Sequence, residues 1–242
     1  MPEISLFIPA YNAENSLPDV LARISLDAWK MIRSVWIIND GSSDGTQSVI
    51  SNLNRKYKPI KCIQFKKNQG YGAAVKAGLL ASRDENINYA ICLHADGQYA
   101  PELIPSFVQS AESGNLDILQ GSRIAGGTAL KGGMPLYKYY FGKMLTLLEN
   151  MVFGLSLTDY HSGYLCYSRK AMMQIPFMNL SNEFDFDLEV IACARKFGLK
   201  IGEIGIPTRY ADEVSYLNPL TYGFRILGVL FRYGCGYYQK VQ

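Results

Sequence analysis

Three side chains that could bind a metal ion together, His94, Asp96 and Gln98, directly follow an apolar run at residues 89–93. The run is short and rich in strand-forming residues, so it predicts a buried strand. Ligands bind at the carboxyl ends of strands in open α/β sheets. His94 and Asp96 are two residues apart and would point to the same side. Such ligands suit Mg²⁺ or Mn²⁺ shared with substrate phosphates, and an ordinary Asp-Gly turn is the alternative.

Two more polar loops follow predicted strands, PAYNAE at residues 9–14 and NDGSSDGT at residues 39–46. They would form neighbouring walls of one crevice. Tyr11 offers a ring that can pack against a base, and Asp40 and Glu14 can accept hydrogen bonds from a base or a ribose. The loops therefore indicate a nucleotide site, with a plain turn as the alternative for Asp40.

Arg123 follows a fifth predicted strand, at residues 117–120. The planar fork of an arginine can bridge phosphates, which favours a role beside a donor diphosphate or an anionic acceptor. A surface arginine in a loop is the alternative.

Four carboxylates lie within residues 183–189, at the start of a predicted helix. Acidic residues favour helix N-termini, so part of this pattern is ordinary. If the acceptor is a hydroxyl, one of them can act as catalytic base, and Asp185 is our choice ahead of Glu183 and Asp187. An acceptor phosphate is already anionic and needs no base.

Apolar strand patterns alternate with helical patterns through the first half of the chain. The predicted strands lie at residues 4–9, 34–39, 60–65, 89–93 and 117–120, and the helices at 15–26, 44–53, 72–81 and 101–113. This alternation predicts an α/β fold with a mostly parallel sheet covered on both faces. The second half predicts helices at 134–155, 184–196 and 218–233, and strands at 164–168 and 200–206.

Composition limits the class of protein. The chain has 242 residues, 48% of them hydrophobic and 19% charged, as in a soluble globular domain. A net charge of +3 gives no argument for nucleic acid binding. The sequence has no signal-peptide pattern and no apolar run of the ~18 residues that span a bilayer. Together with five scattered cysteines, this leads us to expect a cytoplasmic protein.

Two helices carry apolar stripes. In the 134–155 helix the stripe contains Leu136, Tyr140, Met144, Leu147, Leu148, Met151 and Leu155. In the 218–233 helix it contains Leu220, Phe224, Leu227 and Phe231, with Arg225 and Arg232 on one side. Such stripes usually face a core. The neighbouring tyrosines and basic residues also suit helices that lie on the inner face of the cytoplasmic membrane, or that pair with a second subunit in a homodimer.

The ordered motifs PAYNAE, NDGSSDGT, NQGYGAAVKAG and HADGQ resemble the family 2 inverting glycosyltransferases with a GT-A fold. The resemblance covers roughly residues 4–210 and is closest to the dolichyl-phosphate mannose synthase and polyprenyl-phosphate sugar synthase branch. It implies that Pro9, Tyr11, Glu14 and Asp40 hold the nucleotide. The family's Asp-x-Asp metal motif matches Asp96, with His94 in place of the first Asp.

The resemblance extends to the second half. Asp159, Ser162 and Gly163 match a D-x-x-S-G loop that lines the sugar pocket, and Arg123 and Arg209 match arginines near the phosphates. His161 has no counterpart with a role, and we expect it to face solvent.

We therefore expect a metal-dependent inverting glycosyltransferase that uses a nucleotide-diphospho-sugar, with a polyprenyl phosphate as the favoured acceptor and peripheral membrane contact. A hydroxyl of a surface glycan and a degenerate sugar-nucleotide-binding protein are the alternatives. Residues 1–212 would form the catalytic domain, with a nucleotide-binding half at 1–123 and a sugar and acceptor half at 124–212. Residues 213–242 would form an amphipathic helix and tail.

Overall fold

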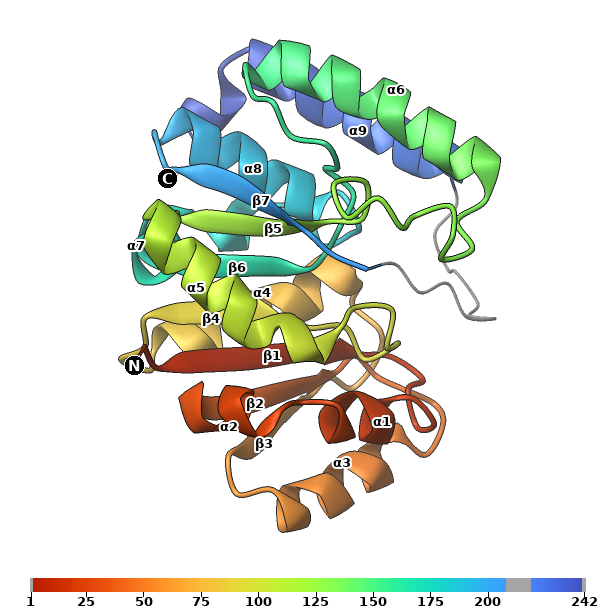
Figure 1. Cartoon of the computed structure of the whole chain (residues 1–242), viewed down its shortest axis with the longest axis vertical. Coiled ribbons are helices and arrows are strands. Elements are labelled where there is room, and N and C mark those ends of the chain that lie inside the picture. The colour runs from red at the N-terminus through yellow and green to blue at the C-terminus, as the bar shows by residue number, and fades with distance from the viewer. Residues whose placement is uncertain (1, 208–218, 241–242) are drawn as a thin grey trace.

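A seven-stranded sheet organises the chain (Figure 1), and the computed structural model describes residues 2–207 and 219–240 of it. The strands are β1 (Ile4–Ala10), β2 (Ile32–Asn39), β3 (Ile60–Gln64), β4 (Tyr89–Cys92), β5 (Ile118–Ser122), β6 (Leu165–Ser168) and β7 (Ile201–Gly205). Their order across the sheet is β3-β2-β1-β4-β6-β5-β7. Of these seven strands β6 alone runs against its neighbours β4 and β5. The predicted α/β architecture with a mostly parallel sheet is confirmed.

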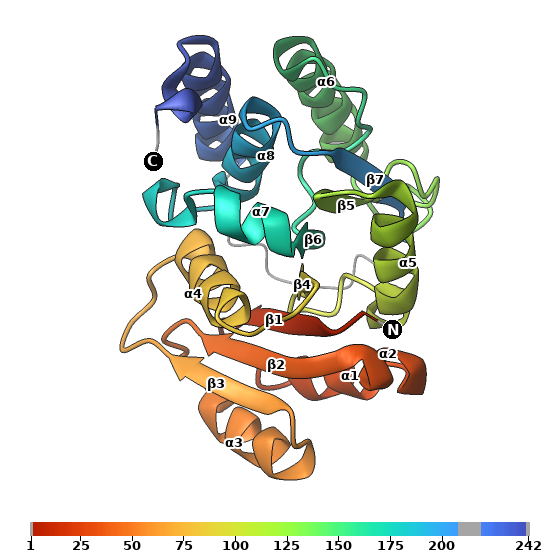
Figure 2. The ribbon, with the colours of Figure 1, turned by 90° about the vertical axis from the view of Figure 1, so that its left-hand side faces the viewer.

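Helices cover both faces of the sheet (Figure 2). They are α1 (Leu17–Ala22), α2 (Leu26–Met31), α3 (Thr46–Lys56), α4 (Tyr71–Arg83), α5 (Ile104–Gly114), α6 (Leu136–Phe153), α7 (Arg169–Gln174), α8 (Phe186–Lys196) and α9 (Pro219–Gly234). Short 3₁₀ turns lie at Pro101–Leu103, Phe177–Asn179 and Tyr237–Gln239. One face carries α1, α2, α3 and α5, and the other carries α4, α7 and α8.

The core consists of two apolar layers, one on each face of the sheet. Strand β1 feeds both layers, because successive side chains point to opposite faces. Ile4, Leu6 and Ile8 lie in one layer and Phe7 lies in the other. A Cβ atom on Gly78 of α4 would lie 2.6 Å from the Phe7 ring, so the absence of a side chain there lets α4 pack closely on the sheet.

Two helix predictions differ from the structure. The helix expected at residues 15–26 is shorter, α1 ending at Ala22, and the unpredicted α2 follows it, because the Ser25 side chain accepts a hydrogen bond from the Ala28 N–H (3.2 Å) and starts a new helix. Helix α7 was not predicted, and Ser168 caps it in the same way through the Ala171 N–H (3.1 Å). Both are short helices specified by one serine rather than by a long apolar period.

Helices α6 and α9 pack against each other beyond β7, and both begin on the side of the sheet to which the carboxyl ends of the parallel strands point (Figure 1). Their predicted stripes face outward. The exposed apolar residues are Leu136, Tyr137, Tyr140, Phe141, Met144, Leu147 and Met151 on α6, and Phe224, Leu227 and Phe231 on α9. The core alternative for these stripes is therefore wrong for most of their residues, although Leu148 and Leu155 do pack on the core.

Arg225 and Arg232 of α9 contact acidic residues of this chain. Arg225 Nη1 lies 3.4 Å from Asp185 Oδ1, and Arg232 Nη1 lies 3.0 Å from Glu189 Oε1. These arginines thus fix α9 to α8. Within residues 2–207 and 219–240, no helix has the length and apolar character needed to cross a bilayer. The domain boundary predicted at residue 212 lies outside the described residues, and the division at residue 123 stays a prediction.

Candidate active site

The polar loops after β1, β2 and β4 meet at one edge of the sheet. β1 lies between the other two strands, with Ala10 paired to Asn39 and Phe7 paired to Cys92. Only one strand therefore separates the loop that carries Asp96 from the loop that carries Asp40, and neighbouring strands are ~4.8 Å apart. The fold thus brings the predicted metal-binding and nucleotide-binding loops to a shared edge.

Hydrogen bonds tie the first two loops together. Glu14 Oε2 accepts from the Gly45 N–H (2.7 Å), and the Ala13 N–H donates to Thr46 Oγ1 (2.8 Å). Tyr11 keeps 38% of its surface exposed, which leaves part of its ring accessible to a base. Pro9 is half-buried at the end of β1. Of the predicted nucleotide contacts in this loop, Tyr11 is the most accessible, and Glu14 also has a structural partner.

Asp40 is buried and holds the turn before α4. Its Oδ1 accepts from the Gln69 N–H (2.7 Å) and its Oδ2 from the Gly70 N–H (3.1 Å). Burial raises the pKa of Asp40, while these two hydrogen bonds oppose the rise. Gly70 has a φ of +96°, and a Cβ there would lie 2.5 Å from the Asn182 carbonyl oxygen. Asp40 and Gly70 therefore join three distant segments at this edge.

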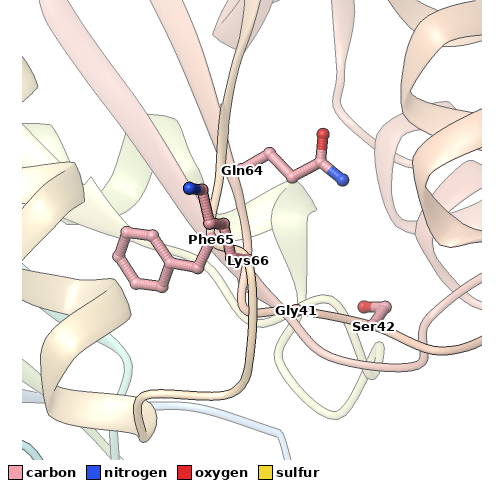
Figure 3. A pocket seen from close by; sticks show the side chains of 5 residues that line it. All are labelled: Gly41, Ser42, Gln64, Phe65 and Lys66. Atoms are coloured by element: carbon pink, nitrogen blue, oxygen red, sulfur yellow. The ribbon is translucent and has the colours of Figure 1, made fainter.

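A hollow of about 320 Å³ lies beside the Asp40 loop (Figure 3). Gly41 and Ser42 line it from the loop after β2, and Gln64, Phe65 and Lys66 line it from the end of β3. An amide, a hydroxyl, an aromatic ring and an ammonium group are the kinds of side chain that a nucleoside can contact.

Asp96 offers a carboxylate for a cation. Its Oδ1 accepts from the Gln98 N–H (3.0 Å), which folds the loop into a tight turn with Gly97 at a φ of +78°. Burial raises the pKa of Asp96, which means that the surroundings disfavour its negative charge. A bound divalent cation would reverse that preference, so the residue fits such an ion.

His94 lies among aromatic rings and polar groups. Its Nε2 is 3.1 Å from the Tyr71 hydroxyl, and Tyr99 packs edge-on against its ring at a centroid distance of 4.9 Å. Burial, reinforced by the charge of Arg123, lowers the pKa of His94 to about 4. The imidazole is therefore neutral at neutral pH, and Nδ1 is the nitrogen not engaged by Tyr71.

The Tyr71 hydroxyl also donates to Asp187 Oδ2 (2.8 Å). Burial raises the pKa of Asp187 to about 7. Of the four carboxylates at the start of α8, Asp187 is thus joined to His94 through Tyr71. Asp185 lies elsewhere: it is 2% exposed, and its Oδ1 accepts from the Ser181 hydroxyl (2.7 Å) and faces Arg225. Its predicted role as a base stays a prediction.

The loop with Ser162 and Gly163 packs under His94. A Cβ on Gly163 would lie 2.5 Å from His94 Nε2 and 2.6 Å from the Tyr71 hydroxyl, so a side chain there would displace this pair. The Ser162 carbonyl accepts from the Gln120 side chain (2.8 Å), which fixes the loop to β5. Ser162 and Gly163 therefore hold the loop against His94 and Tyr71.

Arg123 is held in a fixed orientation beside the loop with Ser162 and Gly163. Its Nε donates to Asp159 Oδ2 (2.9 Å) and its Nη2 donates to the His161 carbonyl (2.8 Å). Burial alone would raise the pKa of Asp159, but the charge and hydrogen bond of Arg123, together with the contributions of His161, outweigh burial and lower the pKa. The ionised Asp159 orients Arg123, in addition to any contact that Asp159 makes with a sugar.

His161 does not face solvent, contrary to the sequence expectation. Its side chain is 13% exposed, with Nε2 3.5 Å from Glu149 Oε2. Arg209 lies outside the described residues. Tyr71, Tyr99 and Glu149 were not singled out from the sequence as part of this site. Tyr71 lies within the motif NQGYGAAVKAG and Tyr99 directly follows HADGQ, whereas nothing local marks Glu149.

In the part of the chain that the structure describes, no group of three or more His, Cys, Asp or Glu side chains is arranged to hold a metal ion. Mg²⁺ in phosphate sites commonly uses one or two protein carboxylates and completes its shell with water and substrate oxygens. Asp96 fits that role, with the Nδ1 of His94 as a possible neutral partner.

Comparisons with known proteins point to one family. The sequence model of the family described as Glycosyl transferase family 2 matches residues 5–175. A UDP-N-acetylglucosamine–dolichyl-phosphate N-acetylglucosaminyltransferase of Methanococcus voltae is 27% identical over 236 residues, covering 92% of each chain. A dolichyl-phosphate beta-glucosyltransferase of Trichomonas vaginalis is 31% identical over 226 residues, covering 86% of this chain and 66% of that protein.

Among solved structures, a glucosyl-3-phosphoglycerate synthase of Mycobacterium tuberculosis in complex with Mn²⁺, uridine diphosphate and phosphoglyceric acid superposes with a TM-score of 0.72. The match has 16% sequence identity and covers 96% of this chain and 78% of that one, and it shows that the chain has the GT-A fold. Since the family model spans most of the sequence and includes the loops that meet at the edge of the sheet, the chain belongs to glycosyl transferase family 2 and is a glycosyltransferase.

Proposed function

We propose that this glycosyltransferase moves a sugar from a nucleotide-diphospho-sugar to a polyprenyl phosphate at the inner face of the cytoplasmic membrane, with inversion and with Mg²⁺ or Mn²⁺ bound. The relatives support the choice of substrates, since both are named for dolichyl phosphate and the one from Methanococcus voltae also for a UDP-sugar. The structural neighbour was solved with Mn²⁺ and uridine diphosphate.

The donor would lie along the carboxyl edge of the sheet. Tyr11 would pack on the base, and Pro9, Glu14 and Asp40 would shape its pocket next to the hollow at Gly41. Asp96, with Gln98 and His94 beside it, would hold the cation. When bound, this ion would stabilise negative charge on the departing diphosphate.

Arg123 would contact phosphate oxygens. In transfer to a lipid phosphate, an acceptor oxygen forms a bond to the sugar carbon while the bond from that carbon to the donor β-phosphate breaks, and the nucleoside diphosphate leaves with the electron pair. No proton needs to be removed from the acceptor. A guanidinium held rigidly by Asp159 can stabilise the charge on either phosphate without reorganising. Ser162 and Gly163 would line the sugar pocket, with Arg209 as a second phosphate contact.

The observation that carries the choice of acceptor is the outward apolar face of α6 and α9. Leu136 and Tyr140 on α6 and Phe224 on α9 are 63%, 65% and 74% exposed. Exposed apolar surfaces of this kind mark interaction sites. Both helices begin on the side of the sheet that carries the site (Figure 1). Exposed Lys131 precedes α6, and exposed Lys143 lies in its second turn. Aromatic and basic residues beside an apolar face suit the interface of an anionic bilayer.

The experiment is a thermal-shift screen of UDP-, GDP- and dTDP-sugars with and without Mn²⁺, followed by transfer assays with each donor that binds. Ligands that bind only the folded state raise its melting temperature. We expect one nucleotide class to stabilise the protein and Mn²⁺ to increase the shift. No shift with any nucleotide would contradict the proposal.

A hydroxyl of a surface glycan is the second candidate acceptor. It would require a base, and Asp185 is the predicted one. An Asp185→Asn variant would then lose transfer to the hydroxyl acceptor. Transfer to a lipid phosphate, which needs no base, would survive the substitution.

A further inference from the structure

Glu149 is a buried carboxylate that the proposed chemistry does not use. It projects from α6 toward the protein interior and is 0% exposed. Among the described residues, neither of its carboxylate oxygens makes a standard hydrogen bond, and its Oε2 lies 3.5 Å from His161 Nε2. A buried ionisable group without a partner is costly, so this pair calls for an explanation.

His161 connects Glu149 to the site. On the far side of its ring, Nδ1 lies 3.2 Å from the hydroxyl of Tyr222 on α9. Its backbone N–H donates to Asp159 Oδ1 (2.9 Å), and its carbonyl accepts from Arg123 Nη2 (2.8 Å). The imidazole is thus held between α6 and α9, while its backbone holds the arginine and the carboxylate that orients it.

The surroundings decide where the proton lies. Burial, with a smaller contribution from the Asp159 carboxylate, raises the pKa of Glu149 to about 8. Burial lowers the pKa of His161 to about 4, with Asp159 opposing and Arg123 reinforcing the shift. Near pH 7 Glu149 is therefore protonated and the imidazole is neutral. The carboxyl O–H can donate to Nε2, and the Nδ1–H can then donate to the Tyr222 hydroxyl.

We propose that Glu149 and His161 share one proton, which the carboxyl of Glu149 holds and donates to His161 Nε2 in a hydrogen bond. This pair, held in place by Tyr222, positions Arg123 for its contact with phosphate. His161 is then a positioning residue, and α6 and α9 support the arginine as well as presenting their apolar faces. The proposal rests on the proposed function for the role of Arg123.

The arrangement makes the site sensitive to alkaline pH. Loss of the proton from Glu149 would leave a buried anion next to a neutral imidazole and near Asp159. Among the described residues, the groups that face it are Asp159 and Tyr160 from the same loop as His161, and Tyr222 from α9. None of them supplies a positive charge, and Arg123 is already paired with Asp159. We expect turnover to fall above pH 8 while KM for the donor changes less.

The first test compares pH profiles of turnover. Glu149→Gln keeps a donor for Nε2 and cannot ionise, so it should retain wild-type kcat at pH 7 within about threefold and lose the alkaline fall. Glu149→Leu removes the donor, and its kcat should be at least tenfold lower at every pH.

Asp117→Asn is the matched control, since Asp117 is a buried carboxylate held by Ser168 and Lys170 at the opposite end of β5. It should leave the alkaline fall unchanged. An alkaline fall that persists in Glu149→Gln, or a wild-type kcat in Glu149→Leu, would overturn the proposal.

The second test does not depend on activity. The chain has two histidines, so ¹⁵N spectra of the imidazoles are simple to assign. His161 should be neutral with the proton on Nδ1 between pH 5.5 and 7.5 in the wild type and in Glu149→Gln, and a mixture of tautomers in Glu149→Leu. The pKa of Glu149 is raised above its ordinary value of 4.5, so the wild type should lose stability relative to Glu149→Gln as pH rises from 4.5 to about 8.

The two tests separate the two claims. If no donor gives transfer but the spectra and the stability profile behave as described, the proposed function fails and the shared proton stands. If transfer occurs but His161 is charged near pH 7, or its tautomer is the same in Glu149→Leu, the shared proton is refuted.

Discussion

Polarity is distributed in opposite ways at the two ends of the sheet. Around β1, β2 and β4, apolar side chains are buried in the strands, and the polar ones, Asp40 and Asp96 among them, gather in the loops at the carboxyl edge. On α6, beyond β7, Tyr140 and Met151 are exposed to more than half of their surface, and Glu149 is buried. The first region is explained by folding in water. For the second region, our proposals supply the reasons: a membrane surface outside it, and the support of Arg123 by the buried acid.

The largest effect that we expect is at the carboxyl edge. Asp96→Ala should lower transfer by about 10²–10³-fold, because the charge on the leaving diphosphate would lose its stabilisation. The melting temperature should hardly change. Asp84→Ala is the control, since Asp84 is exposed and follows α4 at the opposite edge of the sheet, where the parallel strands begin. Transfer by Asp96→Ala within a factor of two of the wild type would remove the basis for a metal at this residue.

Substitution of Arg123 should have the second largest effect on transfer. Arg123→Ala is expected to slow turnover by about 10²-fold, the loss seen when one charge-stabilising donor is removed from an active site. Nucleotide binding should weaken much less. Arg123→Lys should recover only part of the rate, since an ammonium cannot form the paired contact with Asp159. Equal losses in turnover and in nucleotide affinity would contradict this role.

The helix pair is tested by charge on its outward face. Tyr140→Glu combined with Leu147→Glu should weaken binding to anionic vesicles at least tenfold, because each substitution replaces an exposed apolar contact with a repelled charge. The melting temperature should stay within about 2 °C, as for surface substitutions generally. Leu26→Glu on α2 is the control, since Leu26 is 80% exposed and lies on another face. Unchanged vesicle binding, or a protein that becomes monomeric on substitution, would favour a second subunit as the occupant of this face.

The smallest effect concerns the arginines of α9. Arg232→Ala should destabilise the fold by about 1–2 kcal/mol, a value reduced from that of a fully buried pair because Arg232 is 38% exposed. Arg33→Ala, which breaks an exposed pair with Glu3, should cost less than about 0.5 kcal/mol. Denaturant unfolding measures both. If Arg232→Ala were neutral in stability and lowered vesicle binding instead, the arginine would belong to the membrane surface.

Much of the fold could be predicted from the sequence, because the strands are short apolar runs and the loops after them are visibly polar. The edge shared by Asp40 and Asp96 followed from the rule that parallel strands end on one side. The partners of Asp40 could not be predicted, because Gln69 and Gly70 are some 30 residues away and bond through their backbone.

The second half was less predictable because helical periodicity identifies a stripe but not what lies against it. The stripe of α6 would fit a core as well as a membrane, and the structure turns most of it outward. The same rotation carries Glu149 inward, which reverses the ordinary expectation for a charged residue. His161 was expected in solvent, and its side chain is only 13% exposed because α6 and α9 fold over its loop.

The central claim is transfer to a phosphate presented at a membrane surface. The most direct measurement compares two acceptors in anionic vesicles, a polyprenyl phosphate and the matching polyprenol, with the donor selected by the thermal-shift screen. We predict a glycosylated product from the phosphate alone, and loss of that product in the vesicle-binding variant Tyr140→Glu/Leu147→Glu. A product from the polyprenol or a soluble glycan, with none from the phosphate, would contradict the account.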